Sequence, residues 1–226
     1  MPIYTCLSLK GGVGKTTTVL HLATVIASEG RPVTVLDADE EHSAVSWCSV
    51  GGAMPFDVVA AEREGLAQQV RALAKDKSRV VLIDTPPNNR EILTRAGMLA
   101  DVCIVPVVPT GLDLNRLTPT LKMLAEIEAT RGSLIVAILL SRWDGRTILG
   151  REAVDALKRF PLLKARIRAL ERYAQSFGSV PTYLDEYRAA WRELRKHEAH
   201  TFASGHVGGV RTKRRQARGK EAASAT

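Results

Sequence analysis

The sequence is poor in cysteine and aromatic residues, and it contains no long apolar run. Three of its 226 residues are cysteines and 5% are aromatic. The odd number and the spacing of Cys6, Cys48 and Cys103 exclude a disulfide scaffold and match no zinc motif, which favours a reducing compartment. Apolar runs such as residues 134–140 are too short to span a bilayer, and no basic segment precedes an apolar stretch at the N-terminus. We therefore expect a cytoplasmic protein without a membrane partner.

The remaining composition is that of a globular protein with a basic end. Hydrophobic residues make up 45% of the chain and charged residues 25%, which excludes a wholly disordered protein. The length favours one domain, which we expect over residues 1–200, followed by a tail over residues 201–226. Of the net charge of +8, five charges come from residues 204–226, where six basic residues face the single acid Glu221. This stretch has too little apolar surface to fold, so it either contacts nucleic-acid phosphates or keeps the protein soluble.

Strand-like and helix-like patterns alternate along the chain. Apolar runs typical of strands buried on both faces cover residues 3–9, 32–36, 80–83, 102–108 and 134–140. Helical spacing of apolar residues covers residues 16–29, 62–75, 114–130, 150–159 and 184–197. This alternation predicts an α/β fold: a single three-layer domain in which helices flank a mostly parallel sheet. His21 lies inside the first of these helices, and we expect it to be packed rather than to bind a ligand.

A glycine-rich segment lies between the first strand and the first helix. Residues 10–17 read Lys-Gly-Gly-Val-Gly-Lys-Thr-Thr. Glycines let backbone N–H groups turn toward phosphate oxygens, and the N-terminus of the helix adds a positive dipole end. Lys15 can reach the β- and γ-phosphates of a nucleotide, and the Thr16 hydroxyl can bind Mg²⁺. The spacing predicts a phosphate-binding loop formed by Gly11, Gly12, Val13, Gly14, Lys15, Thr16 and Thr17.

Acidic residues end two of the apolar runs. Residues 33–36 lead into Asp37-Ala38-Asp39, and residues 80–83 lead into Asp84. An acid at the end of a buried strand, downstream of a phosphate loop, is typical of the residue that holds Mg²⁺ through its waters, which predicts this role for Asp84 and a place near the metal for Asp37. The alternative for each acid is a cap on the following helix.

The loop departs from the usual G-x-x-x-x-G-K-[ST] pattern, because Leu9 stands at the first glycine and Lys10 begins the loop. The pattern K-G-G-x-G-K-T-T resembles the deviant Walker A motif of ParA and MinD type ATPases, and the resemblance extends to about residue 198. It implies a P-loop NTPase fold, ATP and Mg²⁺ as ligands, and slow ATP hydrolysis. It also implies that Lys10 reaches the nucleotide of a partner subunit and that Asp39 positions the attacking water, so that Lys10, Lys15 and Asp39 are the catalytic candidates.

Two further segments resemble the ParA branch. Residues 144–147 match D-x-R-T, which places Asp144 and Arg146 near the adenine. Residues 176–181 resemble the S-x-G-x-P turn, which places Pro181 at the base. The last helix lacks the broad apolar face that a MinD-like membrane anchor needs. The chain therefore resembles a short ParA without an N-terminal helix-turn-helix.

The ParA resemblance implies a function in DNA segregation. A ParA protein forms a homodimer with ATP, binds DNA without sequence preference on the nucleoid, and is stimulated by a ParB-like adaptor to segregate a plasmid or chromosome. The candidate DNA contacts are basic residues of the last third of the chain, for which the alternative is a solvated helix face: Lys164, Arg166, Arg168, Arg172, Arg188, Arg211, Lys213, Arg214 and Arg215.

Other functions remain open. The family pattern continues Asp-Pro-Gln after the second aspartate, whereas Glu40 and Glu41 follow Asp39 in this chain. This extra negative charge motivates an alternative in which the protein is a nucleotide-gated DNA-binding scaffold with little hydrolysis. An accessory ATPase of conjugative transfer and an ATPase that positions protein clusters are alternatives within the same family.

Overall fold

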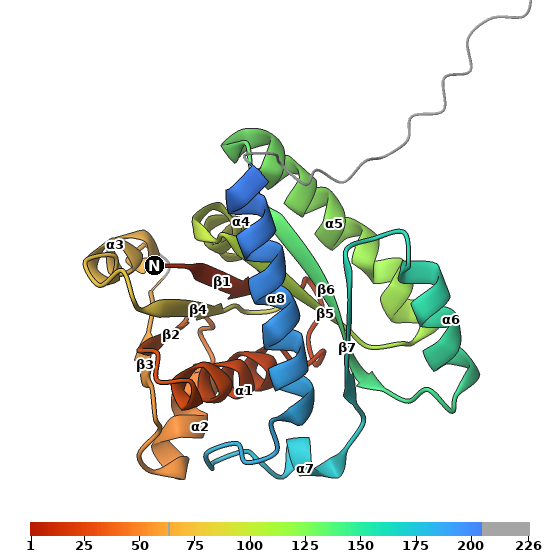
Figure 1. Cartoon of the computed structure of the whole chain (residues 1–226), viewed down its shortest axis with the longest axis horizontal. Coiled ribbons are helices and arrows are strands. Elements are labelled where there is room, and N and C mark those ends of the chain that lie inside the picture. The colour runs from red at the N-terminus through yellow and green to blue at the C-terminus, as the bar shows by residue number, and fades with distance from the viewer. Residues whose placement is uncertain (63, 205–226) are drawn as a thin grey trace, which may run out of the picture.

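Seven parallel strands form one sheet, in the order β3-β2-β4-β1-β5-β6-β7 (Figure 1). This computed structural model describes residues 1–62 and 64–204, without the side chains of residues 111–116 and 197–204. The strands are β1 (Ile3–Cys6), β2 (Val33–Asp37), β3 (Asp57–Ala60), β4 (Val80–Asp84), β5 (Val102–Val107), β6 (Ile135–Trp143) and β7 (Leu162–Arg168). The predicted α/β architecture with a parallel sheet is confirmed.

Helices cover both faces of the sheet (Figure 1). One face carries α1 (Lys15–Ser28), α2 (Ser43–Gly51), α7 (Glu171–Ala174) and α8 (Asp185–Ser204), whose buried residues form one apolar cluster with alternate strand residues. The other face carries α3 (Leu66–Leu73), α4 (Arg90–Leu99), α5 (Gly111–Arg131) and α6 (Ile148–Leu157), which pack on the intervening strand residues. The result is the predicted three-layer arrangement.

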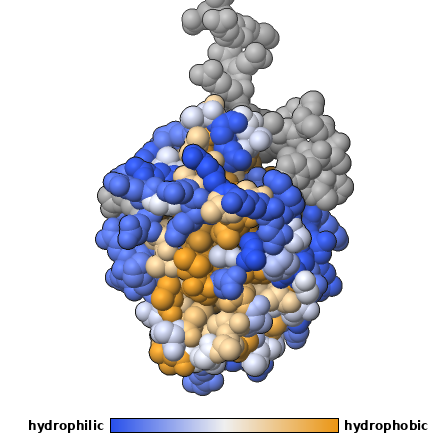
Figure 2. Space-filling view, turned by 90° about the vertical axis from the view of Figure 1, so that its left-hand side faces the viewer, coloured by the Kyte–Doolittle hydropathy of each residue, from blue (hydrophilic) through white to orange (hydrophobic). Residues whose placement is uncertain are grey.

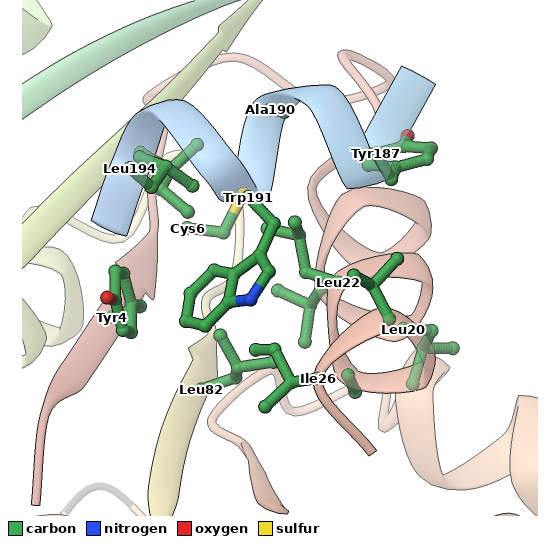
Figure 3. Packing of buried hydrophobic residues seen from close by; sticks show 14 of the residues in the cluster. Tyr4, Cys6, Leu20, Leu22, Ile26, Leu82, Tyr187, Ala190, Trp191 and Leu194 are labelled. Atoms are coloured by element: carbon green, nitrogen blue, oxygen red, sulfur yellow. The ribbon is translucent and has the colours of Figure 1, made fainter. Parts of the chain in front are cut away.

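The aromatic core of the first face fixes α8 against the sheet. Trp191 of α8 is fully buried, and its ring packs edge-on against Tyr4 of β1 at 5.2 Å between centroids. Figure 3 shows the indole between Tyr4, Leu82 of β4 and Ile26 of α1. Burying a side chain of this size stabilises the fold by roughly 2–3 kcal/mol. This packing holds α8 against α1 and the sheet.

Strand β7 was not predicted, and it corrects the interpretation of the basic segment. Leu163, Ala165 and Ile167 are buried, whereas Lys164 and Arg168, at alternate positions, are exposed. This period of two is that of a half-buried strand at the edge of a sheet. A solvated helix face is therefore the wrong description of this segment. Strand β3 and helix α2 were also missed, because the four residues of β3 and the nine residues of α2 carry too little periodicity to predict either element.

The last described helix extends past the predicted domain boundary. Helix α8 ends at Ser204, so residues 201–204 continue the domain's final helix. The remaining tail, with Arg211, Lys213, Arg214 and Arg215, lies outside the described residues. Within the described part, no helix combines the length and the apolar character that crossing a membrane requires.

Candidate functional site

The predicted site residues meet at the carboxyl edge of the sheet. Cys6 of β1 and Asp37 of β2 are both register partners of Asp84, the last residue of β4. The glycine-rich loop leaves β1 at the same edge and leads into α1. Ligands of parallel α/β sheets bind outside the carboxyl ends of the strands. The topology therefore brings the loop and two acidic residues to one place.

The loop ends in an open helix N-terminus. Gly12 and Gly14 have φ values of 72° and 87°, which side chains other than glycine rarely adopt. Gly14 occupies the N-cap position of α1, and no side chain caps this helix. The N–H groups of the first helical turn are therefore available to an anion. The Ser141 hydroxyl of β6 donates to the Val13 carbonyl at 2.8 Å and holds the loop in place.

Lys15 brings a buried cation to this N-terminus. Its side chain is 7% exposed, and its Nζ donates to the Lys10 carbonyl at 3.3 Å. The amide of Lys10 is held in turn by the Ser8 hydroxyl at 3.2 Å. A buried ammonium is costly unless negative charge lies beside it. The loop, Lys15 and the helix N-terminus together form a site suited to phosphate.

Asp84 is a buried carboxylate whose hydrogen bonding is incomplete. It is fully buried, and neither of its oxygens has a hydrogen-bond partner of normal geometry among the described residues. Burial raises the pKa of Asp84 to about 7, opposed by the nearby Thr16 hydroxyl and by Lys15. A carboxylate and a hydroxyl with oxygens to spare are the donor set that Mg²⁺ binds in nucleotide sites. Thr16 and Asp84 therefore fit a metal ion.

Asp37 has a different environment from Asp84. Its carboxylate accepts backbone hydrogen bonds from Asp39, Ala44 and Val45 at 2.9–3.2 Å. Burial raises the pKa of Asp37, and these backbone N–H groups oppose that rise. These contacts are those of a helix cap on α2, and a metal role for Asp37 stays a prediction.

Asp39 lies where the chain turns from β2 into α2. Its Oδ1 accepts the Glu41 N–H at 3.1 Å, and its carbonyl accepts the His42 N–H at 2.9 Å. The side chain is 8% exposed and lines a cavity of about 260 Å³ with Glu40 and His42. Asp39 is therefore a fixed carboxylate at the border of a space that water can enter.

A cavity of about 300 Å³ adjoins the loop on the side of β6 and β7. Its walls come from the loop and α1, from the ends of β6 and β7, and from α7 and α8: Val13, Gly14, Thr17, Ser141, Arg142, Ile167, Arg168, Ala169, Leu170, Tyr173, Ala174 and Tyr187. A cavity of about 490 Å³ shares Arg168, Ala169 and Leu170 with it and contains Asp144 and Arg146. A mostly apolar cavity beside a phosphate site suits a flat base.

Asp144 and Arg146 form an ion pair at the second cavity. The Arg146 guanidinium donates to both oxygens of Asp144, with Nη2–Oδ2 at 2.8 Å, and its hydrogen bonds lower the pKa of Asp144 to about 2. Pro181 is buried and lines neither cavity. Asp144 and Arg146 thus line a cavity that adjoins the one beside the loop, and the assignment of all three residues to the adenine stays a prediction.

Comparison with known proteins identifies the family. Residues 4–179 match the model of the CobQ/CobB/MinD/ParA nucleotide binding domain. The chain belongs to this family. It is 32% identical over 177 residues to the maintenance of carboxysome distribution protein A of Gloeobacter kilaueensis, covering 75% of this chain and 78% of that protein. It is also 32% identical over 130 residues to protein ParA of Rhizobium radiobacter, covering 57% of this chain and 58% of that protein.

Solved structures of family members have the same fold. The cell division ATPase MinD of Pyrococcus furiosus superposes with a TM-score of 0.69 at 20% identity, over 87% of this chain and 99% of that one. Cobyrinic acid a,c-diamide synthase of Mycobacterium smegmatis, solved with bound ADP and magnesium, gives a TM-score of 0.64 at 21% identity, over 91% and 97%. The expectation of a P-loop NTPase fold is confirmed.

The sequence did not point to most residues that line the cavity beside the loop, among them Ser141, Arg142, Tyr173 and Tyr187. Ser141 and Arg142 lie in the last three residues of β6, so the rule that ligands bind at the carboxyl ends of strands could have found them. Arg142 also has a φ of 49°, which is unusual for a residue with a side chain. Tyr173 and Tyr187 come from helices whose position relative to the loop depends on the tertiary fold.

Among the residues that the structure describes, the predicted DNA contacts include four arginines that make contacts within the chain. Arg166 donates to the carbonyls of Leu163 and Ala165, and Arg168 pairs with Glu186. Arg172 lies over the ring of Tyr183 at 4.3 Å, and Arg188 donates to the Ser28 hydroxyl at 3.1 Å. Lys164 is exposed. The arginines of this cluster are thus engaged in intramolecular contacts, and a DNA role for them stays a prediction.

Proposed function

We propose that the protein is a ParA-type ATPase that binds ATP with Mg²⁺ at the glycine-rich loop and uses the nucleotide to control its dimerisation and its binding to DNA. The observation that carries this proposal is the combination at one sheet edge of an uncapped helix N-terminus, the buried Lys15 and the incompletely bonded Asp84. Relatives named ParA and a chromosome-partitioning ATPase named Soj support the partition role.

Different residues of the site contact the phosphates, the metal ion, the attacking water and the base. The N–H groups at the start of α1 and the Lys15 ammonium bind the phosphates, and Thr16 with Asp84 holds Mg²⁺, which neutralises charge that develops on the phosphates. Asp39 orients the attacking water. The cavity beside the loop accepts the base against apolar and aromatic walls.

Lys10 completes the site of a second subunit in this proposal. Its backbone is held at the amide by Ser8 and at the carbonyl by Lys15, which fixes the point at which its side chain leaves the loop. A cation supplied from a partner subunit stabilises the charge of the transition state. The γ-phosphate and Mg²⁺ then bind the dimer better than the monomer, and hydrolysis returns the protein to monomers.

DNA binding without sequence preference follows from positive charge. The tail and exposed basic residues such as Lys164 would contact phosphates, so affinity falls as salt rises. The protein would act in the cytoplasm, bound to the nucleoid. A ParB-like adaptor would stimulate ATP hydrolysis and so release the protein from the nucleoid. The cargo of this cycle is a plasmid or a chromosome.

The second candidate is the positioning of a protein assembly on DNA. Relatives named maintenance of carboxysome distribution protein A, from Gloeobacter kilaueensis and Halothiobacillus neapolitanus, match at 32% and 28% identity. The ATP cycle is the same in both candidates, and the partner protein differs. Pull-down of the ATP-bound protein on DNA-coated beads, followed by identification of the partner it retains, distinguishes a DNA-bound adaptor from a protein shell.

The proposal is tested by phosphate release and DNA binding with no nucleotide, ADP, or ATP with Mg²⁺. We expect slow ATP hydrolysis by the wild type and none by Asp39→Ala. We expect DNA binding with ATP and Mg²⁺, but not with ADP or without nucleotide. Turnover absent from the wild type, with ATP-dependent DNA binding retained, would favour the scaffold that Glu40 and Glu41 suggest. DNA binding that ignores nucleotide would contradict the switch.

A further inference from the structure

Two carboxylates of α8 cover the outer edge of the sheet. Strand β7 pairs with β6 on one side and ends the sheet on the other. Glu193 accepts the backbone N–H groups of Lys164 and Ala165, both at 2.7 Å. Glu186, seven residues earlier on the helix, accepts the backbone N–H of Arg168 at 2.8 Å. Residues seven apart lie on the same face of a helix, so one helix holds β7 both in its middle and at its last residue.

The carboxylate of Glu186 has two further partners, and both reach the cavity beside the loop. It also accepts hydrogen bonds from the Arg168 side chain and from the Tyr173 hydroxyl, the latter at 2.8 Å. Arg168 and Tyr173 line the cavity, whereas the partners of Glu193 do not. Both glutamates therefore accept hydrogen bonds from the backbone of β7. Of the two, only Glu186 also binds side chains that line the cavity.

Several contacts make this anchor firm. The Glu186 side chain is 11% exposed, and hydrogen bonds to an ionised acceptor in such surroundings are among the strong ones. Burial and the bond to Glu186 keep the pKa of Tyr173 well above its usual range, so its hydroxyl remains a donor. Arg168 is held a second time by the Tyr183 hydroxyl at 2.8 Å. Both cavity residues are thus bound by the same carboxylate.

We propose that Glu186 is a positioning residue for the nucleotide: it holds Arg168 and Tyr173 in the cavity wall and so sets the affinity for the nucleoside half of ATP. This inference rests on the proposed function, because it takes the cavity beside the loop as the base site. The phosphate half does not depend on Glu186, since the loop is held by Ser141 and Lys15. Loss of Glu186 should therefore weaken the binding of the nucleoside half and leave the binding of the phosphates unchanged.

The experiment compares ATP with a ligand that has no nucleoside. Titration calorimetry of the full chain, with Mg²⁺ present, measures the affinity for ATP and for inorganic tripolyphosphate. We expect Glu186→Gln to lower the affinity for ATP about tenfold and to leave the affinity for tripolyphosphate within about twofold of the wild-type value. Glu193→Gln is the matched control, because it loses the same kind of bond to β7 away from the cavity. It should lower the melting temperature without changing either affinity.

A second variant guards against misfolding. Tyr173→Phe removes only the hydroxyl that donates to Glu186. It should also lower the affinity for ATP, by a smaller factor than Glu186→Gln. Equal ATP affinities for wild type, Glu186→Gln and Tyr173→Phe would overturn the inference while leaving the proposed function intact. Equal losses for ATP and tripolyphosphate would also overturn it, because they would report damage to the loop. A wild type that binds neither ligand would contradict the proposed function itself.

Discussion

Asp37 and Asp84 are register partners on adjacent parallel strands, yet only Asp37 has its hydrogen bonds satisfied. Asp37 ends β2 and accepts three backbone N–H groups, two of them from the first turn of α2. Asp84 ends β4 beside Thr16 and Lys15, and its two oxygens have no such partners among the residues described. The same side chain at equivalent places thus serves a structural purpose in one strand and leaves a ligand site in the other.

This difference predicts opposite effects of the same substitution. Asp37→Asn should destabilise the protein by roughly 1–3 kcal/mol, because the capped N–H groups of α2 lose part of their acceptor. Asp84→Asn should leave the ligand-free protein as stable as the wild type or more stable at pH 7, because it removes a buried charge that has no full partner. Urea unfolding of both variants without nucleotide or metal checks this, and a large loss of stability in Asp84→Asn would contradict the assignment.

The two lysines of the loop should separate binding from dimerisation. Lys15→Ala should abolish measurable ATP binding, because it removes the buried cation at the helix N-terminus. Lys10→Ala should keep most of the ATP affinity and lose the ATP-dependent dimer. Calorimetry and size-exclusion chromatography with light scattering measure the two properties. A Lys10→Ala protein that still dimerises with ATP would show that this side chain does not act across subunits.

His21 should make the stability of the protein sensitive to acid. Burial among the rings of Trp47, Tyr173 and Tyr187 lowers the pKa of His21 to about 4. Its ordinary value is 6.5, so the unfolded chain binds the extra proton between these two pH values. Stability should therefore fall as pH drops from about 6.5 to about 4, by roughly 3 kcal/mol at most from this residue.

The control for His21 is a variant that cannot titrate. His21→Phe places another ring among the same aromatic neighbours and removes the imidazole. Urea unfolding at several pH values should give a flatter dependence between pH 4 and pH 6.5 for the variant than for the wild type. Identical slopes would mean that other groups cause the acid sensitivity.

Removal of residues 205–226 tests the charged tail. This truncation takes away six basic residues and one acid and stops where α8 ends. If the tail contacts phosphates, DNA affinity should fall, and the slope of log affinity against log salt should become shallower by up to about 5. Fluorescence anisotropy with duplex DNA at several salt concentrations measures this slope. An unchanged slope would leave the tail as a solubility segment.

Local sequence patterns were enough to predict the phosphate loop, whereas the cavity could be recognised only from the tertiary structure. The loop, Lys15 and Thr16 lie within eight consecutive residues, and a strand and a helix flank them in the sequence as in the structure. Asp84 was predictable because an apolar run leads directly to it. These features depend on neighbours in the chain, which a pattern can represent.

The cavity beside the loop could not be predicted in this way. Ser141, Arg168, Tyr173 and Tyr187 come from β6, β7, α7 and α8, and the strand order of the sheet together with the packing of the helices on it brings them to the loop. The alternation in β7 was hidden because its outward positions carry charges that also suit a solvated helix. Pro181 was chosen from a motif alone and lines neither cavity, so its contact with the base stays a prediction.

An apolar area on the side of β3 and α2 plays no part in the proposed cycle. Figure 2 shows apolar surface gathered on this side of the molecule. Val50 at the end of α2 and Val59 of β3 are 70% and 42% exposed, and Phe177 is 57% exposed. These residues lie outside both cavities beside the loop. Substituting them with polar residues should therefore leave ATP binding unchanged.

If Asp84 and the loop form one site for ATP with Mg²⁺, calorimetric titration of ATP with and without Mg²⁺ will detect their cooperation. The wild type should bind ATP more tightly when Mg²⁺ is present, and Asp84→Asn should lose that gain while keeping the metal-free affinity. A wild type that binds ATP equally well with and without Mg²⁺, or an Asp84→Asn variant that keeps the full gain, would contradict the account.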